Sequence, residues 1–134
     1  MELTNWKSQL AHWNRATLPL NRAMSRTKVD DLEVLGVIHI FSFNLKLALK
    51  TLTSFCSNQD GLIQEDPKNI IRIAFSQGLI KDSEVWMDML KSQNNALLNY
   101  DDKVRYQLFD SIVDHFYSSL TSLQCSLNNR AAHD

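Results

Sequence analysis

The sequence predicts an all-α protein, an antiparallel four-helix bundle with one additional short helix. Apolar residues recur every three or four positions along most of the chain, which is the period of helices that bury one face. The 134 residues include three Gly and two Pro, too few for a fold of many short strands, which needs turns about every 8 to 12 residues. A chain of this length fits one domain, residues 1–134, with an ordinary hydrophobic core.

The first helix is expected over residues 1–16, where four apolar side chains form one stripe: Leu3, Trp6, Leu10 and Trp13. Pro19 then interrupts the pattern, because proline lacks an amide donor and disfavours helix at the residue before it. Residues 17–29 are therefore expected to be a loop or linker with at most a loose extra turn. The two tryptophans are expected in the core, whereas an exposed one would mark an interface.

The second helix is expected over residues 30–57, with Asp30 or Asp31 at its N-cap. Apolar residues occupy nearly every side of this helix, so we expect it to be central and covered on more than one side. Gly36 is a weak point in the helix, and the close approach of a neighbouring helix would explain its presence.

Three further helices are expected over residues 66–77, 82–97 and 101–127. Asp66-Pro67 is typical of a helix start, because the carboxylate accepts from free amides and proline at the first position sacrifices no hydrogen bond. The glycine that follows residue 77 ends the third helix in a Schellman-type contact. The polar tail, residues 128–134, is expected to fray.

Charge and composition exclude some functions. The net charge of −1 argues against strong, non-specific nucleic-acid binding. Residues 1–29 carry five basic side chains against Glu2, a net +4, which leaves −5 on residues 30–134. This basic segment is either a solvated arm or a contact for an acidic partner or a phosphate.

Neither the cysteines nor the histidines stand at metal-ligand spacing, so we expect no metal and no cofactor. Cys56 and Cys125 are expected to be small buried groups in a reducing compartment. With no signal-peptide-like segment and no apolar run of 18 residues, we expect a cytoplasmic protein that does not span a membrane. Phosphate-binding glycine loops and the Gly-Ser and paired-Asp pattern of nucleotidyltransferases are missing, so the chain is not expected to be the transferase itself.

Several segments together carry a family resemblance. Residues 86–100 resemble the pattern W-x-D-M-x-x-x-R-N-x-x-x-H-x-Y, with Trp86, Asp88, Met89, Asn94 and Tyr100 in register. Residues 74–80, Asp66-Pro67-Lys68 and the Ala-x-Lys-Thr-Leu ending of residues 48–52 also match. The chain thus resembles the nucleotidyltransferase substrate-binding proteins, small helical members of the HEPN superfamily.

The resemblance also shows what this chain has lost. Relatives with an intact Arg and His in the motif can act as ribonucleases, the His as acid or base and the Arg against phosphate charge. Here those positions are Gln93 and Leu98, and neither side chain can replace them. Arg130 and His133 are set aside as a substitute because they lie in the tail and close in sequence. We therefore expect no catalytic residue and no enzymatic activity.

The resemblance implies a non-catalytic substrate-binding subunit that works with a separately encoded minimal nucleotidyltransferase, in a two-component system of the toxin–antitoxin kind. It also implies a homodimer formed through the helix that carries the degenerate motif, and a nucleotide or RNA ligand. The candidate ligand or partner residues are Lys46, Lys50, Asp88, Gln93, Asn94, Asn95, Asn99 and Tyr100. Two alternatives remain open: a ribonuclease toxin with altered residues, tested by Gln93→Ala or Asn94→Ala, and a purely structural homodimer.

Overall fold

The computed structural model describes residues 6–26, 30–60, 66–98 and 101–133, and the side chains of 57–60 and 94–98 are not described. In these ranges the chain is helical, without strands. The helices are α1 (Trp6–Met24), α2 (Asp31–Asp60), α3 (Pro67–Ser76), α4 (Ser83–Leu98), α5 (Asp102–Ser111), the π-helical turn η1 (Ile112–Phe116) and α6 (Tyr117–His133).

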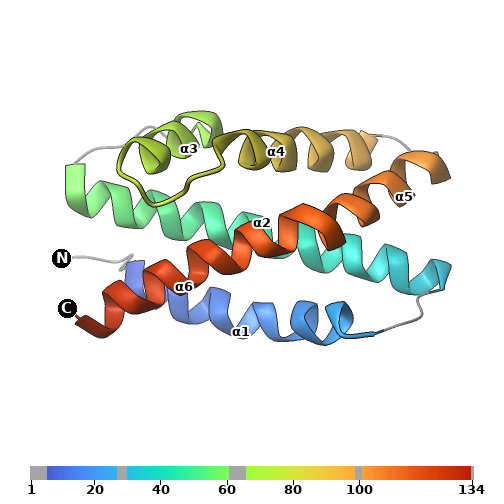
Figure 1. Ribbon diagram of the computed structural model, residues 1–134, viewed down its shortest axis with the longest axis horizontal. Helices are drawn as coiled ribbons and strands as arrows, with labels where there is room; N and C mark the ends of the chain where they lie inside the picture. Colours follow the sequence, from blue (N-terminus) through green and yellow to red (C-terminus); the bar gives the residue numbers. More distant parts are fainter. Residues whose placement is uncertain (1–5, 27–29, 61–65, 99–100, 134) are drawn as a thin grey trace.

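The helices form four antiparallel rods, which confirms the predicted all-α bundle (Figure 1). The first two rods are α1 and α2, the third is α3 followed by α4, and the fourth is the continuous run α5–η1–α6. This last rod returns to the end of the bundle where α1 begins. Helix α2 packs along α1 and also contacts α3, α5 and α6, while α4 packs on α3, α5 and η1.

Local hydrogen bonds explain where the helices start and stop. The Asp66 carboxylate accepts from the Lys68 amide at 3.1 Å, and Asp101 caps α5 in the same way at 3.0 Å. At the start of α2 the N-cap is Asp30. Its carboxylate accepts a hydrogen bond from the Glu33 amide at 2.8 Å, and the Glu33 carboxylate accepts one from the Asp30 amide at 3.1 Å. These contacts confirm the predicted helix starts.

The end of α3 also follows the prediction. Gly78 has a φ of +78°, a conformation that glycine adopts without a steric penalty. The Leu79 amide then donates to the Ala74 carbonyl at 2.9 Å and the Gly78 amide to the Phe75 carbonyl at 3.0 Å. This pair of bonds is a Schellman motif, and it turns the chain toward α4.

The predicted loop over residues 17–29 is wrong in its first half, because α1 continues to Met24 with Pro19 inside it. Thr17 and Leu20 are buried against the rest of the bundle, and this burial outweighs the single hydrogen bond that proline removes. Trp6 and Trp13 are both buried, as expected. Residues 27–29 lie outside the described residues.

The helix predicted over 101–127 is also wrong in detail, since it is divided by η1 and α6 runs on to His133 instead of fraying after residue 127. The buried stripe of this rod repeats every four residues from Leu108 to Leu120, which is longer than the α-helical period. A π-helical turn is wider, so it keeps this stripe on the core side. The fourth helix begins at Ser83 and ends at Leu98, one residue later at each end than the predicted 82–97.

A buried polar network joins three rods inside the core. The Thr17 hydroxyl lies 3.0 Å from Asn44 Oδ1 and accepts from Gln124 Nε2 at 2.7 Å. Asn44 Nδ2 also donates to the carbonyls of Ala16 and Ile40, at 3.1 and 2.9 Å. Because buried polar groups are costly when unpaired, the network fixes α1, α2 and α6 relative to one another.

Helix α2 is central, as expected, since it packs against α1, α3, α5 and α6, but part of its surface stays exposed. Its inner face, including Phe41, Leu45 and Leu52, is fully buried, while Leu32 and Phe43 on its outer face are exposed. The segment 31–56 is also long and apolar enough, by length and composition, to cross a membrane, and 39% of its most apolar window is buried. A core helix of a soluble protein passes the same test.

Candidate functional site

Lys46 and Lys50 line one groove, the lysine groove, together with other residues of α2, one residue of α1 and the first residue of α3. The groove has a volume of about 480 Å³, and it is lined by Gln9, Lys46, Leu49, Lys50, Thr53, Ser54 and Pro67. Both lysines are exposed and stand one helical turn apart. Two ammonium groups beside amide and hydroxyl groups suit an anionic ligand such as a phosphate.

The other predicted site residues do not line this groove. Asp88 is exposed and Gln93 half-buried on α4, which packs on α3, α5 and η1. Asn94 and Asn95 belong to the last turns of α4, but their side chains, like all of Asn99 and Tyr100, lie outside the described residues. Of the eight candidates, the structure therefore brings together Lys46 and Lys50.

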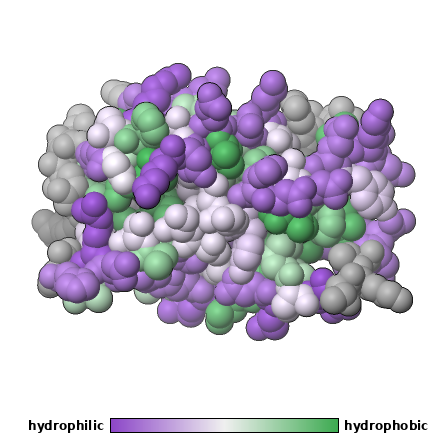
Figure 2. Space-filling view, in the orientation of Figure 1, coloured by the Kyte–Doolittle hydropathy of each residue, from purple (hydrophilic) through white to green (hydrophobic). Residues whose placement is uncertain are grey.

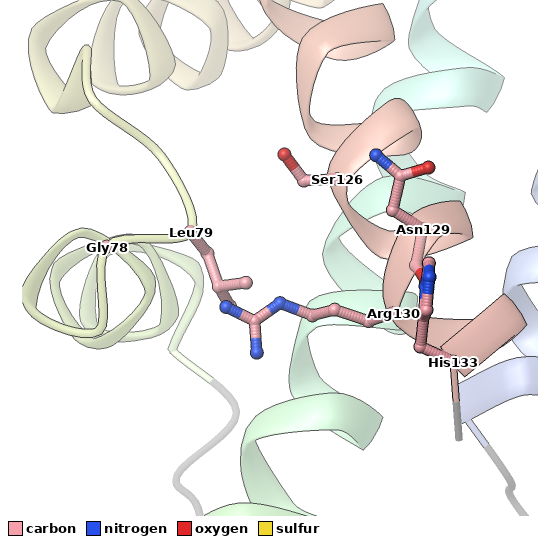
Figure 3. Close-up of a pocket in the computed structure, with 6 residues that line it drawn as sticks. All are labelled: Gly78, Leu79, Ser126, Asn129, Arg130 and His133. Atoms are coloured by element: carbon pink, nitrogen blue, oxygen red, sulfur yellow. The ribbon is translucent and has the colours of Figure 1, made fainter.

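A second cavity, the Arg130 cavity, lies between the α3–α4 connection and the last turns of α6 (Figure 3). It has a volume of about 370 Å³ and is lined by Gly78, Leu79, Ser126, Asn129, Arg130 and His133. Figure 3 shows the Arg130 side chain reaching from α6 toward Leu79 on the opposite wall. Its guanidinium carbon also lies 5.6 Å from the centre of the Phe55 ring, a cation–π contact.

A hydroxyl-lined groove of about 310 Å³ adjoins the Arg130 cavity and shares Gly78, Leu79 and Ser126 with it. Its α6 wall includes Ser118, Ser119 and Ser122, and the Ser119 hydroxyl donates to the Asp82 carboxylate across the groove. Figure 2 shows the corresponding pale, weakly polar band across the middle of this face, over α6.

Sequence reasoning missed the Arg130 cavity because it treated Arg130 and His133 as part of a frayed tail. The signal was present in the spacing, since positions 126, 129, 130 and 133 share one face of a helix. Helix α6 continues through these positions, and the same two residue types that serve in ribonuclease motifs therefore line one cavity. His133 Nδ1 lies 2.7 Å from the Asn129 carbonyl oxygen, which orients the imidazole.

The described ranges contain no group of three or more His, Cys, Asp or Glu side chains placed to hold a metal ion. Cys56 is buried, as expected, but Cys125 is exposed, so the prediction that both are buried is wrong for Cys125. Its place on the outer side of α6 explains the difference, because the core face of that helix is occupied by Leu120, Leu123 and Leu127. The two cysteines form no disulfide.

The described residues thus form an all-α helical bundle with grooves on its surface. The family model described as nucleotidyltransferase substrate binding protein like matches residues 8–129, so the chain belongs to that family. The match extends from α1 to α6 and confirms the resemblance found in the sequence. A search of curated proteins finds no match.

Proposed function

We propose that this protein is the non-catalytic, substrate-binding subunit of a two-component system whose second component is a separately encoded nucleotidyltransferase. The family match over residues 8–129 is the observation that carries this proposal. The Gln93 and Leu98 replacements at the Arg and His positions of the motif support a subunit of the HEPN type that binds without cutting. We place it in the cytoplasm, as a homodimer in a toxin–antitoxin-like pair.

The ligand is a nucleotide or an RNA end, and the lysine groove receives its phosphate groups. Lys46 and Lys50 supply two positive charges one turn apart, and Gln9 and Ser54 line the same groove with neutral polar groups. Asp88 and Gln93 on α4 belong to the surface that faces the transferase. The other four candidates follow them in the sequence: Asn94, Asn95, Asn99 and Tyr100. In this arrangement the transferase supplies all of the chemistry.

Co-expression of the tagged chain with a small, separately encoded nucleotidyltransferase from the same cell tests the proposal. We expect the two proteins to co-purify and to form a complex at micromolar concentration. Asp88→Lys should weaken that complex, while Lys103→Asp on the exposed first turn of α5 serves as a matched charge reversal elsewhere on the surface. The absence of a complex at micromolar concentration would contradict the proposal.

A second candidate function is cleavage of RNA, which the Arg130 cavity favours. Arg130 and His133 both line this cavity, and together they offer a phosphate-stabilising cation and a proton-transfer group. This function predicts cleavage by the purified chain that is lost in His133→Ala but kept in His12→Ala, an exposed histidine on α1. If cleavage is lost in Gln93→Ala or Asn94→Ala instead, the altered motif is the site of cleavage. If the purified chain cleaves none of several RNAs, both the Arg130 cavity and the altered motif are excluded as ribonuclease sites.

A further inference from the structure

Helix α1 is basic along one side and carries no acidic side chain. The helix and the turn after it contain Lys7, Arg15, Arg22 and Arg26 but no Asp or Glu. Arg15, Leu18 and Arg22 follow one another at spacings of 3 and 4 residues, so they share one side of the helix, and Leu18 is 53% exposed there. Among the described residues, neither Arg15 nor Arg22 forms an ion pair. This side of α1 therefore keeps a positive charge that the described part of the chain does not neutralise.

A groove, called here the Gly36 groove, opens beside this basic side between the end of α1 and the start of α2. Its volume of about 340 Å³ lies at the lower end of the usual range for binding pockets. The small or apolar part of its lining consists of Pro19, Ala23, Gly36, Val37 and Ile40. Arg22, Arg26 and Glu33 also line it, and the last two pair with each other at 2.6 Å. Arg22 therefore supplies the net charge of the groove.

Gly36 keeps this groove open at a cost to α2. A glycine inside a helix weakens it relative to alanine. A Cβ added at Gly36 would meet no atom within 4 Å, so the close approach of a neighbouring helix that would explain this glycine is not made by the described part of the chain. A side chain at this position would instead occupy the groove. The open lining therefore favours an occupant from outside the chain.

We propose that the Gly36 groove binds an acidic segment of another protein. One apolar side chain of the segment packs over Gly36, against Val37 and Ile40. The acidic side chains of the segment follow α1 from Arg22 to Arg15, away from the acidic start of α2. The two arginines are about 10 Å apart along the helix, a distance that three residues of extended chain span.

Charge complementarity and the apolar lining together favour a protein segment over other anions. Arginine forms paired hydrogen bonds with carboxylates, and Leu18 offers an apolar contact between the two arginines. A single-stranded nucleic acid would gain less, because none of the groove's described lining residues is an aromatic side chain on which a base could stack. An acidic segment with one apolar anchor matches both the charge and the apolar lining.

The groove is separate from the surfaces of the proposed function. Helices α1 and α4 lie on opposite sides of the bundle (Figure 1), and Lys46 and Lys50 line a different groove. The inference therefore adds a second contact surface, and it does not depend on the transferase.

Nuclear magnetic resonance titration of the isotope-labelled full chain with a synthetic peptide tests the inference. The peptide is acetyl-Glu-Glu-Glu-Leu-Glu-Glu-Glu-amide, whose three acidic residues on either side of the leucine reach from Arg22 to Arg15. At low ionic strength, where charges are least screened, we expect the amide signals of Gly36, Ala23 and Leu18 to shift, with a Kd below about 1 mM. A peptide with glycine in place of the leucine should bind about tenfold more weakly, because it lacks the apolar anchor. Equal binding of the two peptides, or no binding, would overturn the inference.

Substitutions in the chain locate the peptide. Gly36→Leu fills the groove without a clash at its Cβ, so it should weaken peptide binding at least about tenfold while the melting temperature stays the same or rises. Arg22→Gln should weaken binding about fivefold, since it removes a charge-assisted contact. Arg72→Gln removes an exposed arginine from α3 and should leave binding unchanged. Equal affinity of Gly36→Leu and the wild-type chain, or equal effects of the two arginine variants, would contradict the proposed site.

The remaining outcomes separate other occupants and the proposed function. Tighter binding of a single-stranded oligouridine at Gly36 would assign the groove to RNA and overturn the inference. Tighter binding of phosphatidylglycerol vesicles that Gly36→Leu abolishes would assign it to a membrane surface, with the same consequence. Lys50→Gln should leave peptide binding unchanged, so a failure of the peptide to bind removes this inference alone, and a failure of the transferase complex removes the proposed function alone.

Discussion

Helices α2 and α4 have equally buried inner faces but opposite outer faces. Phe41 on α2 and Trp86 on α4 are both fully buried. On the outside, α4 presents the charged residues Glu84, Asp88 and Lys91 as far as its side chains are described, whereas α2 presents Leu32 and Phe43 together with Lys46 and Lys50. Water hydrates charged side chains on a helix surface, whereas exposing apolar side chains to water is unfavourable.

This difference bears on how the chain assembles. The family resemblance implies self-pairing through the helix of residues 86–100, yet the described outer surface of α4 is charged and well suited to solvent or to an oppositely charged partner. On α2, Leu32 and Phe43 are exposed beside Lys46 and Lys50. Under the proposed function, we therefore expect α4 to face the transferase.

The largest expected effect comes from the inner faces, where the two helices should behave alike. Phe41→Ala and Trp86→Ala should each lower the free energy of unfolding by about 3–5 kcal/mol, because each leaves a cavity in a packed core. Asp88→Ala on the outer face of α4 should change it by less than about 0.5 kcal/mol. Urea unfolding at a fixed protein concentration measures all three, and a cost under about 1 kcal/mol for either aromatic variant would show that the core is not packed as described.

The buried polar network provides the next effect. Asn44→Ala removes the acceptor that lies 3.0 Å from the Thr17 hydroxyl and the bonds that Asn44 donates to the carbonyls of Ala16 and Ile40, and it should cost about 1–3 kcal/mol. Asn128→Ala removes an exposed inter-helix bond to Asn14, 2.9 Å long, and should cost less than about 0.5 kcal/mol. Thermal unfolding followed by circular dichroism compares the two variants, and equal costs would argue against a buried network.

The sequence predicted the fold wherever local chemistry decides it. Asp66-Pro67 and Asp101 start helices through bonds that span only two or three residues, and Gly78 ends one in the same way. The first half of the 17–29 segment became helix because Leu20 is buried by residues far away in the sequence. The network between Thr17 and Gln124 joins positions 107 residues apart, which no local pattern reveals.

The site was predictable to a similar extent. Lys46 and Lys50 meet because they are one turn apart on a helix whose existence was clear from its apolar period. Asp88 and Gln93 were grouped with them through the resemblance, but they lie on a different rod. Arg130 and His133 share a cavity only because α6 stays helical to His133, which depends on packing that a tail composition does not show.

The smallest expected effect concerns the ligand. About 1 mM of a nucleoside triphosphate should raise the melting temperature of the wild-type chain, since a ligand that binds the folded state stabilises it. Lys50→Gln should reduce that rise to about half or less, as one of two phosphate-facing charges is lost. Lys91→Gln on the outer face of α4 is the matched control. An equal rise in all three proteins would exclude the lysine groove as the phosphate site.

The most direct test of the whole account is sedimentation velocity of the chain alone and mixed with a separately encoded nucleotidyltransferase from the same cell. We predict a dimer for the chain alone and a larger complex for the mixture, with the transferase bound to the dimer rather than in place of one copy. A monomeric chain that leaves the transferase at its own sedimentation rate would contradict the proposed binding role.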